Sequence, residues 1–191
     1  MGNNYLSDPL VFLVQVLFGL YALIVMLRFL LQWVRADFYN PLSQFIVKAT
    51  KPVLNPLRKI IPGVGGKDIA SLVLAWLVIS LQMLLIFLIS EKTFAPGAAL
   101  LLAIPELLGL TINIFLYSIL IMVVISWVNP AGHNPAISIL YSLTEPLLRP
   151  ARNMIPPLGG IDLSPMVVMI GLVLLKMLLI PPVKALMISL L

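Results

Sequence analysis

Residues 40–69 read NPLSQFIVKATKPVLNPLRKIIPGVGGKDI, and residues 134–163 read NPAISILYSLTEPLLRPARNMIPPLGGIDL. Both stretches are polar and rich in proline, and each is flanked by long apolar runs. Aligned at a constant offset of 94 residues without gaps, 15 of the 41 positions from 33 to 73 are identical, mostly Pro, Gly and polar residues. Generic apolar composition would match Leu and Val instead, so the chain contains an internal duplication.

The shared positions define a loop motif, which is either structural or a binding surface for lipid or a partner. In the first copy the motif consists of Asn40, Pro41, Thr50, Pro52, Pro56, Arg58, Pro62, Gly65, Gly66 and Asp68. In the second copy it consists of Asn134, Pro135, Thr144, Pro146, Pro150, Arg152, Pro156, Gly159, Gly160 and Asp162.

The composition indicates a membrane protein, because 61% of the 191 residues are hydrophobic and only 10% are charged. A soluble domain carries about 25% charged residues. Four apolar stretches reach the roughly 20 residues that a membrane span needs, at about 9–34, 69–90, 106–128 and 163–180. We expect residues 95–105 to form a separate lead-in near the surface. We expect the last span to end at Pro181-Pro182, with an interfacial turn beyond it.

The fold class that follows is an all-α membrane protein with four transmembrane helices. Residues 1–92 and 93–191 each form one span–loop–span repeat, with a short amphipathic helix at the membrane interface in each loop. Because an even number of crossings separates the copies, the repeats are parallel. They are not inverted, as the repeats of many transporters are.

Orientation follows from the lysines and arginines, which accumulate in the two loops that carry the motif. Those loops hold Arg35, Lys48, Lys51, Arg58, Lys59, Lys67, Arg149 and Arg152, whereas the opposite side holds Lys92 and Lys184. The positive-inside rule predicts that both loops face the cytoplasm and both termini the periplasm. The net charge of +5 then indicates contact with anionic lipid headgroups, and we expect no nucleic-acid binding.

Each loop predicts the same local structure. Asn40-Pro41 is an N-cap followed by a proline at the first helical position. Leu42, Phe45, Ile46 and Ala49 then predict the apolar face of a short amphipathic helix that lies in the inner membrane interface. The prolines at 52/146 and 56/150 predict an end to that helix and an extended path. Gly65-Gly66 and Gly159-Gly160 predict turns, and Asp68 and Asp162 predict caps for the following spans.

The loop charges present in both copies are Arg58/Arg152 and Asp68/Asp162. They indicate either an ion pair that fixes the loop or an arginine site for a lipid phosphate. Inside the spans, Arg28 is close enough to the cytoplasmic end for its side chain to reach the headgroups. A cluster of polar residues falls in the outer half of the bilayer, comprising Gln15, Gln82, Glu106, Asn113 and Lys176. The cluster is either a set of interhelical contacts, with Lys176 meeting Glu106, or a polar cavity for an ion or proton.

The sequence contains no group of residues that indicates an enzyme active site. There is no cysteine, and the one histidine, His133, lies in a turn whose counterpart in the other copy is Tyr39. We therefore expect no metal site, no cofactor and no catalytic activity.

The repeated pattern N-P-x(8)-T-x-P-x(3)-P-x-R-x(3)-P-x(2)-G-G-x-D resembles that of the YggT family, in its two-copy Gram-negative form. The resemblance covers residues 9–180, and it implies an inner-membrane protein associated with osmotic stress and potassium homeostasis. Single-copy relatives imply roles in cell division or cytochrome haem assembly. The second copy departs from the first at charged positions that include Lys51/Glu145, Lys59/Asn153 and Lys67/Ile161.

Two classes of function remain at this stage. In the first, the protein is an accessory or assembly factor whose cytoplasmic loops bind headgroups, a membrane-protein partner or a second copy. In the second, it is a small channel or transport-linked protein that works through the polar residues of the spans. The concentration of duplicated identity in the loops favours the first class.

Overall fold

The computed structural model describes residues 4–128, 134–155 and 162–191 and confirms the all-helical fold. Four of its helices are long and apolar enough to cross a membrane. They are α1 (Asn4–Trp33), α3 (Ile69–Ile86), which continues into the π-helical turn η1 (Phe87–Glu91), α4 (Pro96–Val128) and α6 (Ser164–Ser189). The other two helices are α2 (Pro41–Ile60) and α5 (Pro135–Met154), which carry the loop motif.

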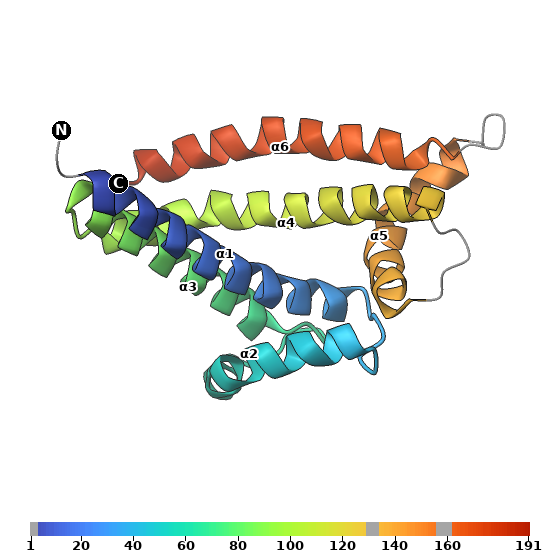
Figure 1. Cartoon of the computed structure of the whole chain (residues 1–191), viewed down its shortest axis with the longest axis horizontal. Helices are drawn as coiled ribbons and strands as arrows, with labels where there is room; N and C mark the ends of the chain where they lie inside the picture. The colour runs from blue at the N-terminus through green and yellow to red at the C-terminus, as the bar shows by residue number, and fades with distance from the viewer. Residues whose placement is uncertain (1–3, 129–133, 156–161) are drawn as a thin grey trace.

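The four long helices pack side by side in the order α1, α3, α4, α6 (Figure 1). Helix α2 packs on α1 and α3, and α5 packs in the corresponding way on α4 and α6. The first residues of α1 and the last of α6 lie at one end of the molecule, which we call the terminal end (Figure 1). Helices α2 and α5 lie toward the other end, which we call the loop end. Both repeats therefore run in the same direction.

Two spans are longer than the sequence predicted. The expected lead-in at 95–105 is the first third of α4, which runs unbroken through Pro105. Ala99 and Ala103 are buried, so packing against neighbouring helices holds this segment in helical form. Helix α6 likewise continues past Pro181-Pro182 to Ser189. An apolar run follows these prolines, and the backbone has no better alternative to a helix in an apolar environment.

The prediction that the loop prolines end the amphipathic helices was wrong. Pro52 and Pro56 lie inside α2, and Pro146 and Pro150 lie inside α5. All four are exposed. Since their spacing of four puts each pair on one outward face, the missing N–H donors leave gaps only on that face. The opposite face is buried without interruption, so packing keeps the helix continuous.

Helix α2 packs on the spans through Ser43, Ile46, Thr50 and Leu54, which are buried. Ile46 belongs to the predicted apolar face, whereas Leu42 and Phe45 of that face are exposed. In both copies the motif threonine and the leucine four residues later, Thr50/Leu54 and Thr144/Leu148, are fully buried. The repeat therefore conserves the residues with which each amphipathic helix packs against its spans.

Candidate functional site

A buried charge network joins α1, α2 and α3 at the loop end of the first repeat. Arg58 donates to both carboxylate oxygens of Asp68, and Ser71 Oγ donates to the Oδ2 atom of the same residue. The carboxylate is almost fully buried, with a side-chain exposure of 5%, whereas that of Arg58 is 39%. The predicted Arg58–Asp68 ion pair is therefore present, and it connects the end of α2 to the start of α3.

Arg28 belongs to this network, and the prediction that it reaches the headgroups was wrong. Its exposure is 6%, and its Nη1 donates to the Val47 carbonyl at 3.0 Å and to Thr50 Oγ1. Its Nε lies 3.9 Å from Asp68 Oδ2. The guanidinium turns inward because α2 offers acceptors and α3 offers a carboxylate at the same level of the fold. Sequence reasoning missed this role, although an acidic residue precedes the next span at the same end of the molecule.

The network sets the charge state of Asp68. Burial alone would raise the pKa of Asp68, but the hydrogen bonds from Arg58 and Ser71 and the positive charges of Arg58 and Arg28 outweigh it. The result is a pKa below the ordinary value for aspartate. The prediction that the Asp68 side chain caps α3 was wrong. Its carboxylate oxygens accept hydrogen bonds from Arg58 and Ser71 instead.

The second repeat builds a related network with the opposite charge balance. Arg152 donates to Asp162 Oδ2 and to Glu145 Oε2, both at 2.9 Å. Asp162 Oδ1 accepts from the backbone N–H of Ser164, the first residue of α6, at 2.9 Å, although the N-cap position itself is Leu163 and not Asp162 as predicted. Burial raises the pKa of Asp162, but this backbone bond and Arg152 outweigh burial and lower it.

The two networks differ at the position of Arg28. Its counterpart 94 residues later is Met122, whose sulfur accepts from Thr144 Oγ1 at 3.3 Å. One carboxylate thus faces two arginines in the first repeat, and one arginine faces two carboxylates in the second. The repeats share a scaffold but present different electrostatics.

The two amphipathic helices are joined at their N-termini. Asn40 Oδ1 accepts from the Leu42 N–H at 3.0 Å and Asn134 Oδ1 from the Ala136 N–H at 2.9 Å, so both predicted N-caps are formed. Asn40 Nδ2 also donates to the Pro135 carbonyl at 2.7 Å. This bond connects α2 of one repeat directly to α5 of the other.

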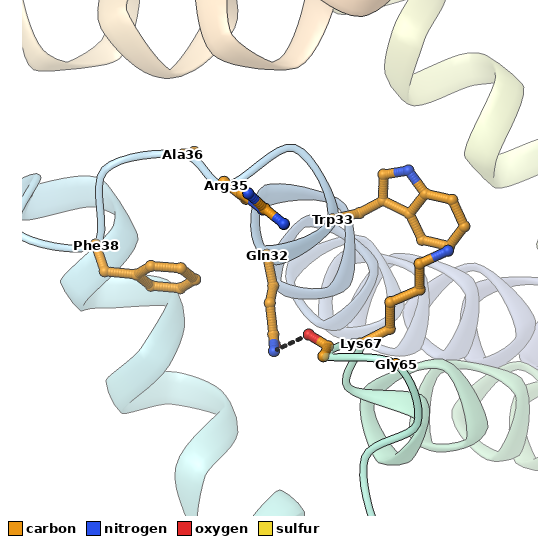
Figure 2. Close-up of a pocket in the computed structure, with 8 residues that line it drawn as sticks. Gln32, Trp33, Arg35, Ala36, Phe38, Gly65 and Lys67 are labelled. Carbon is orange, nitrogen blue, oxygen red and sulfur yellow. Dashed lines mark hydrogen bonds between the residues drawn. The ribbon is translucent and has the colours of Figure 1, made fainter.

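The predicted glycine turn of the first repeat closes a small pocket at the loop end of α1 (Figure 2). Gly65 and Gly66 both have positive φ, and Val64 and Lys67 pair across them, as in a two-residue hairpin turn. Figure 2 shows the Lys67 ammonium over the Trp33 ring, 3.3 Å from its centroid, and Gln32 Nε2 donating to the Gly66 carbonyl at 3.3 Å. These contacts hold the turn against α1, around a pocket of about 330 Å³.

All five polar residues predicted inside the spans line one cavity of about 560 Å³. Gln15 comes from α1, Gln82 from α3, Glu106 and Asn113 from α4, and Lys176 from α6. The predicted meeting of Lys176 with Glu106 was wrong, because Lys176 Nζ donates to Asn113 Oδ1 at 2.9 Å instead. Glu106 lies two turns, about 10 Å, further along α4, and forms no ion pair with Lys176 among the described residues.

The cavity lies between the repeats and is built from equivalent positions of both. At the offset of 94 residues its lining contains four matched pairs, namely Gln15/Gly109, Gly19/Asn113, Gln82/Lys176 and Ile86/Ile180. A polar side chain on α1 or α4 thus corresponds to a glycine on the other helix. The glycines have no side chain to fill the space, and the polar side chains border it.

Of the remaining motif residues, Pro62 is exposed beyond the end of α2. Pro156, Gly159, Gly160 and the turn residue His133 lie outside the residues that the structure describes.

The fold and these networks define a multi-pass α-helical membrane protein made of two parallel repeats. Its sequence matches the CCB3/YggT family model over residues 7–89 and again over 101–183, segments that begin and end 94 residues apart. The chain belongs to the CCB3/YggT family.

Several relatives are similar over most of their length. A protein of Pseudomonas aeruginosa is 47% identical over 178 residues, which cover 92% of this chain and 90% of that protein. The YggT protein of Escherichia coli K12 is 39% identical over 172 residues, covering 89% of this chain and 88% of the relative.

A plant protein matches one part of the chain. It is the chloroplast protein CCB3 of Arabidopsis thaliana, whose full name describes cofactor assembly of complex C. It is 39% identical over 87 residues, which cover 44% of this chain and 48% of that protein. No solved structure matches the chain significantly.

Proposed function

We propose that the protein is a non-enzymatic accessory or assembly factor of the bacterial inner membrane. In this proposal α2 and α5 face the cytoplasm, and both termini face the periplasm. The helices act as a rigid platform for anionic headgroups and a membrane-protein partner or second copy. The name of the plant relative supports an assembly role. The family resemblance suggests osmotic stress and envelope homeostasis as the setting.

The observation that supports this proposal is the set of polar contacts that fix α2 to α1, α3 and α5. Arg28 and Arg58 connect α2 to α1 and α3 through Asp68, and Asn40 connects α2 to α5. A helix that only had to link two spans would need none of these bonds between helices. The outward face of α2 carries three exposed cations, Lys48, Lys51 and Lys59. Such a face is suited to anionic headgroups and to acidic partner surfaces.

Complementation of an E. coli strain that lacks its YggT protein tests the proposal. Growth at high osmolarity and the haem content of the membranes would be measured with wild type, with the combined variant Lys48→Glu, Lys51→Glu, Lys59→Glu, and with Lys176→Met. We expect the α2 variant to lose complementation while reaching the membrane in normal amounts. Full complementation by the α2 variant together with failure of Lys176→Met would reject the platform.

One observation favours a second candidate function. The polar cavity lies at the interface of the repeats, where secondary transporters place their substrate sites, so a transport-linked role in ion homeostasis is the alternative. One observation argues against ion conduction through a single chain. The space that continues from this cavity toward the loop end is lined almost wholly by apolar side chains. Potassium flux into proteoliposomes that Lys176→Met abolishes and Lys184→Met leaves unchanged would establish the alternative.

A further inference from the structure

The polar cavity between the repeats is continuous with a second cavity. It adjoins a larger cavity of about 880 Å³ that runs along α1 and α4 toward α2 and α5. The two cavities share Gln15, Gly19, Leu110 and Asn113 in their linings. They form one recess, polar toward the terminal end and apolar toward the loop end. The exposed Leu42 and Phe45 from the apolar face of α2 line the apolar end.

Contact between α1 and α6 does not close the polar end of the recess. Within the described residues, α6 contacts α4 and α5 but not α1, although residues of both α1 and α6 line the polar cavity. Polar side chains that face hydrocarbon are costly unless something satisfies them. Among the described residues, the amides of Gln15 and Gln82 make no hydrogen bond, although both line the cavity. These donors are available to a ligand that enters from the membrane.

The depth and charge of the polar end limit the ligand. Lys176 is 12 residues from the first residue of α6 and 13 from the last, and Asn113 is 15 residues from the last residue of α4 and 17 from the first. Both side chains therefore start about 18 Å or more from either end of their helices, near the middle of the membrane. A phosphate would have to leave the headgroup layer to reach them. It would also pass Glu106, which lies nearer the terminal end and repels anions. The charged lining consists of that one carboxylate and one ammonium group, a balance that favours an uncharged head.

The glycines of the recess provide the space for such a head. A Cβ atom built on Gly19 or Gly109 would meet no other heavy atom within 4 Å. Both glycines line the polar cavity, and Gly19 lies where it joins the apolar one. The lining offers donors to such a head, because the Lys176 ammonium carries three N–H groups and each of the amides of Gln15, Gln82 and Asn113 carries an NH2 group beside its acceptor oxygen.

We propose that this recess binds a membrane amphiphile of the isoprenoid-quinone class, with its small uncharged head accepting hydrogen bonds from Lys176 and the glutamine amides and its apolar tail lying along α1 and α4 toward α2 and α5. The site goes beyond the platform role, since it uses neither the cations of α2 nor the buried arginine network.

The full chain in phosphatidylcholine nanodiscs, labelled with a photoreactive azido-ubiquinone analogue, provides the test. Mass spectrometry would locate the labelled peptides, with unlabelled decylubiquinone, diacylglycerol and phosphatidylglycerol as competitors. We expect saturable labelling on α1 and α4 that decylubiquinone displaces at concentrations at least tenfold lower than either acyl lipid. Labelling spread evenly over the lipid-facing surface, or equal competition by diacylglycerol or phosphatidylglycerol, would overturn the proposal.

Matched variants make the site assignment specific. Gly19→Leu fills the junction of the two cavities, and Lys176→Met removes the central donor. Each should reduce labelling at least tenfold. The controls Gly171→Leu and Lys184→Met lie on α6 outside both linings and should label like wild type. Gln82→Leu is a further variant in case Gly19→Leu alters thermal unfolding. Unchanged labelling in Lys176→Met and Gln82→Leu, both folded, would reject the site whatever the platform variants do.

Discussion

Arg28 and Met122 occupy the same position in the two repeats but interact differently. Replacing Arg28 with Met removes its hydrogen bonds to Val47 and Thr50 and the second positive charge near Asp68. We expect Arg28→Met to lower the free energy of unfolding by about 2 kcal/mol, since hydrogen bonds to charged groups are among the stronger ones. The midpoint of thermal unfolding in detergent measures this loss.

The matched control is Met122→Leu, which conserves volume at the equivalent position and should cost less than about 1.5 kcal/mol. Equal stability of Arg28→Met and wild type would show that the buried arginine is not a structural partner of α2.

Asp68 predicts how stability depends on pH. The ordinary pKa of an aspartate in an unfolded chain is about 3.9. The pKa of Asp68 in the folded protein lies below that value. A carboxylate with a lowered pKa stabilises the fold above the unfolded value, and that contribution is lost as the pH falls through the folded value. We therefore expect a flat unfolding midpoint from pH 7 to about 5 and a decline below about pH 4. Circular dichroism melts across this range check it.

The two aspartates should contribute unequally to that decline. Asp68 is 5% exposed and Asp162 is 43% exposed, and an exposed ion pair stabilises little. Asp68→Asn should flatten the acid limb of the curve more than Asp162→Asn does. The reverse order would contradict the assignment of Asp68 as the central acceptor.

At the scale of single residues, the sequence identified the Arg–Asp pairs because both copies contain them. It missed the role of Arg28, since the comparison of repeats shows Met at that position and a lone arginine near a helix end usually reaches toward headgroups. Only the packing of α2 across α1 brings the Val47 carbonyl and Thr50 to the guanidinium.

At the scale of elements, α2 and α5 are continuous helices despite two internal prolines each. If packing of the buried face keeps these helices continuous, the exposed Pro52 destabilises α2 without contributing a compensating contact. We expect Pro52→Ala to raise the free energy of unfolding by about 1 to 3 kcal/mol, because it restores a backbone donor to the helix. Pro146→Ala should act in the same direction. A loss of stability in both variants would show that the prolines set the path of the backbone.

The turn at Gly65-Gly66 gives an opposite prediction. Gly65 has a φ of 59°, a conformation that costs an L-residue about 1 kcal/mol or more. Gly65→Ala should therefore destabilise by about that amount, although a Cβ there meets no other atom within 4 Å. Gly171→Ala, inside α6, should instead stabilise by about 0.5 to 1 kcal/mol. Thermal unfolding of both variants separates backbone conformation from side-chain packing.

The sequence predicted the helical spans, the Asn40 and Asn134 N-caps and the Gly65-Gly66 turn correctly because these depend on local chemistry, whereas the predicted Asp68 cap is not formed. Apolar length, Asn-Pro and Gly-Gly each determine the nearby backbone. It failed at the prolines of both amphipathic helices and at the ends of α4 and α6. There, local preference opposes a helix, and burial or continued apolar surroundings overcome that preference.

At the scale of the whole molecule, the duplication explains both the arrangement of the spans and the cavity between them. The sequence identified the polar residues as a cluster in one half of the bilayer. The offset of 94 residues pairs Gln15 with Gly109 and Gly19 with Asn113, but only the packing of the helices shows that these positions border one cavity. The apolar continuation toward α2 and α5 was equally hidden.

The central claim is that the two repeats insert in the same direction and place α2 and α5 on one face. The chain contains no cysteine, so single cysteines can report on each segment. The measurement is labelling of Lys51→Cys, Arg149→Cys, Phe94→Cys and Leu190→Cys in intact cells with a membrane-impermeant maleimide. We predict that positions 94 and 190 react from outside, and that positions 51 and 149 react only after permeabilisation. Reaction of 51 and 149 from opposite sides of the membrane would contradict the parallel repeat.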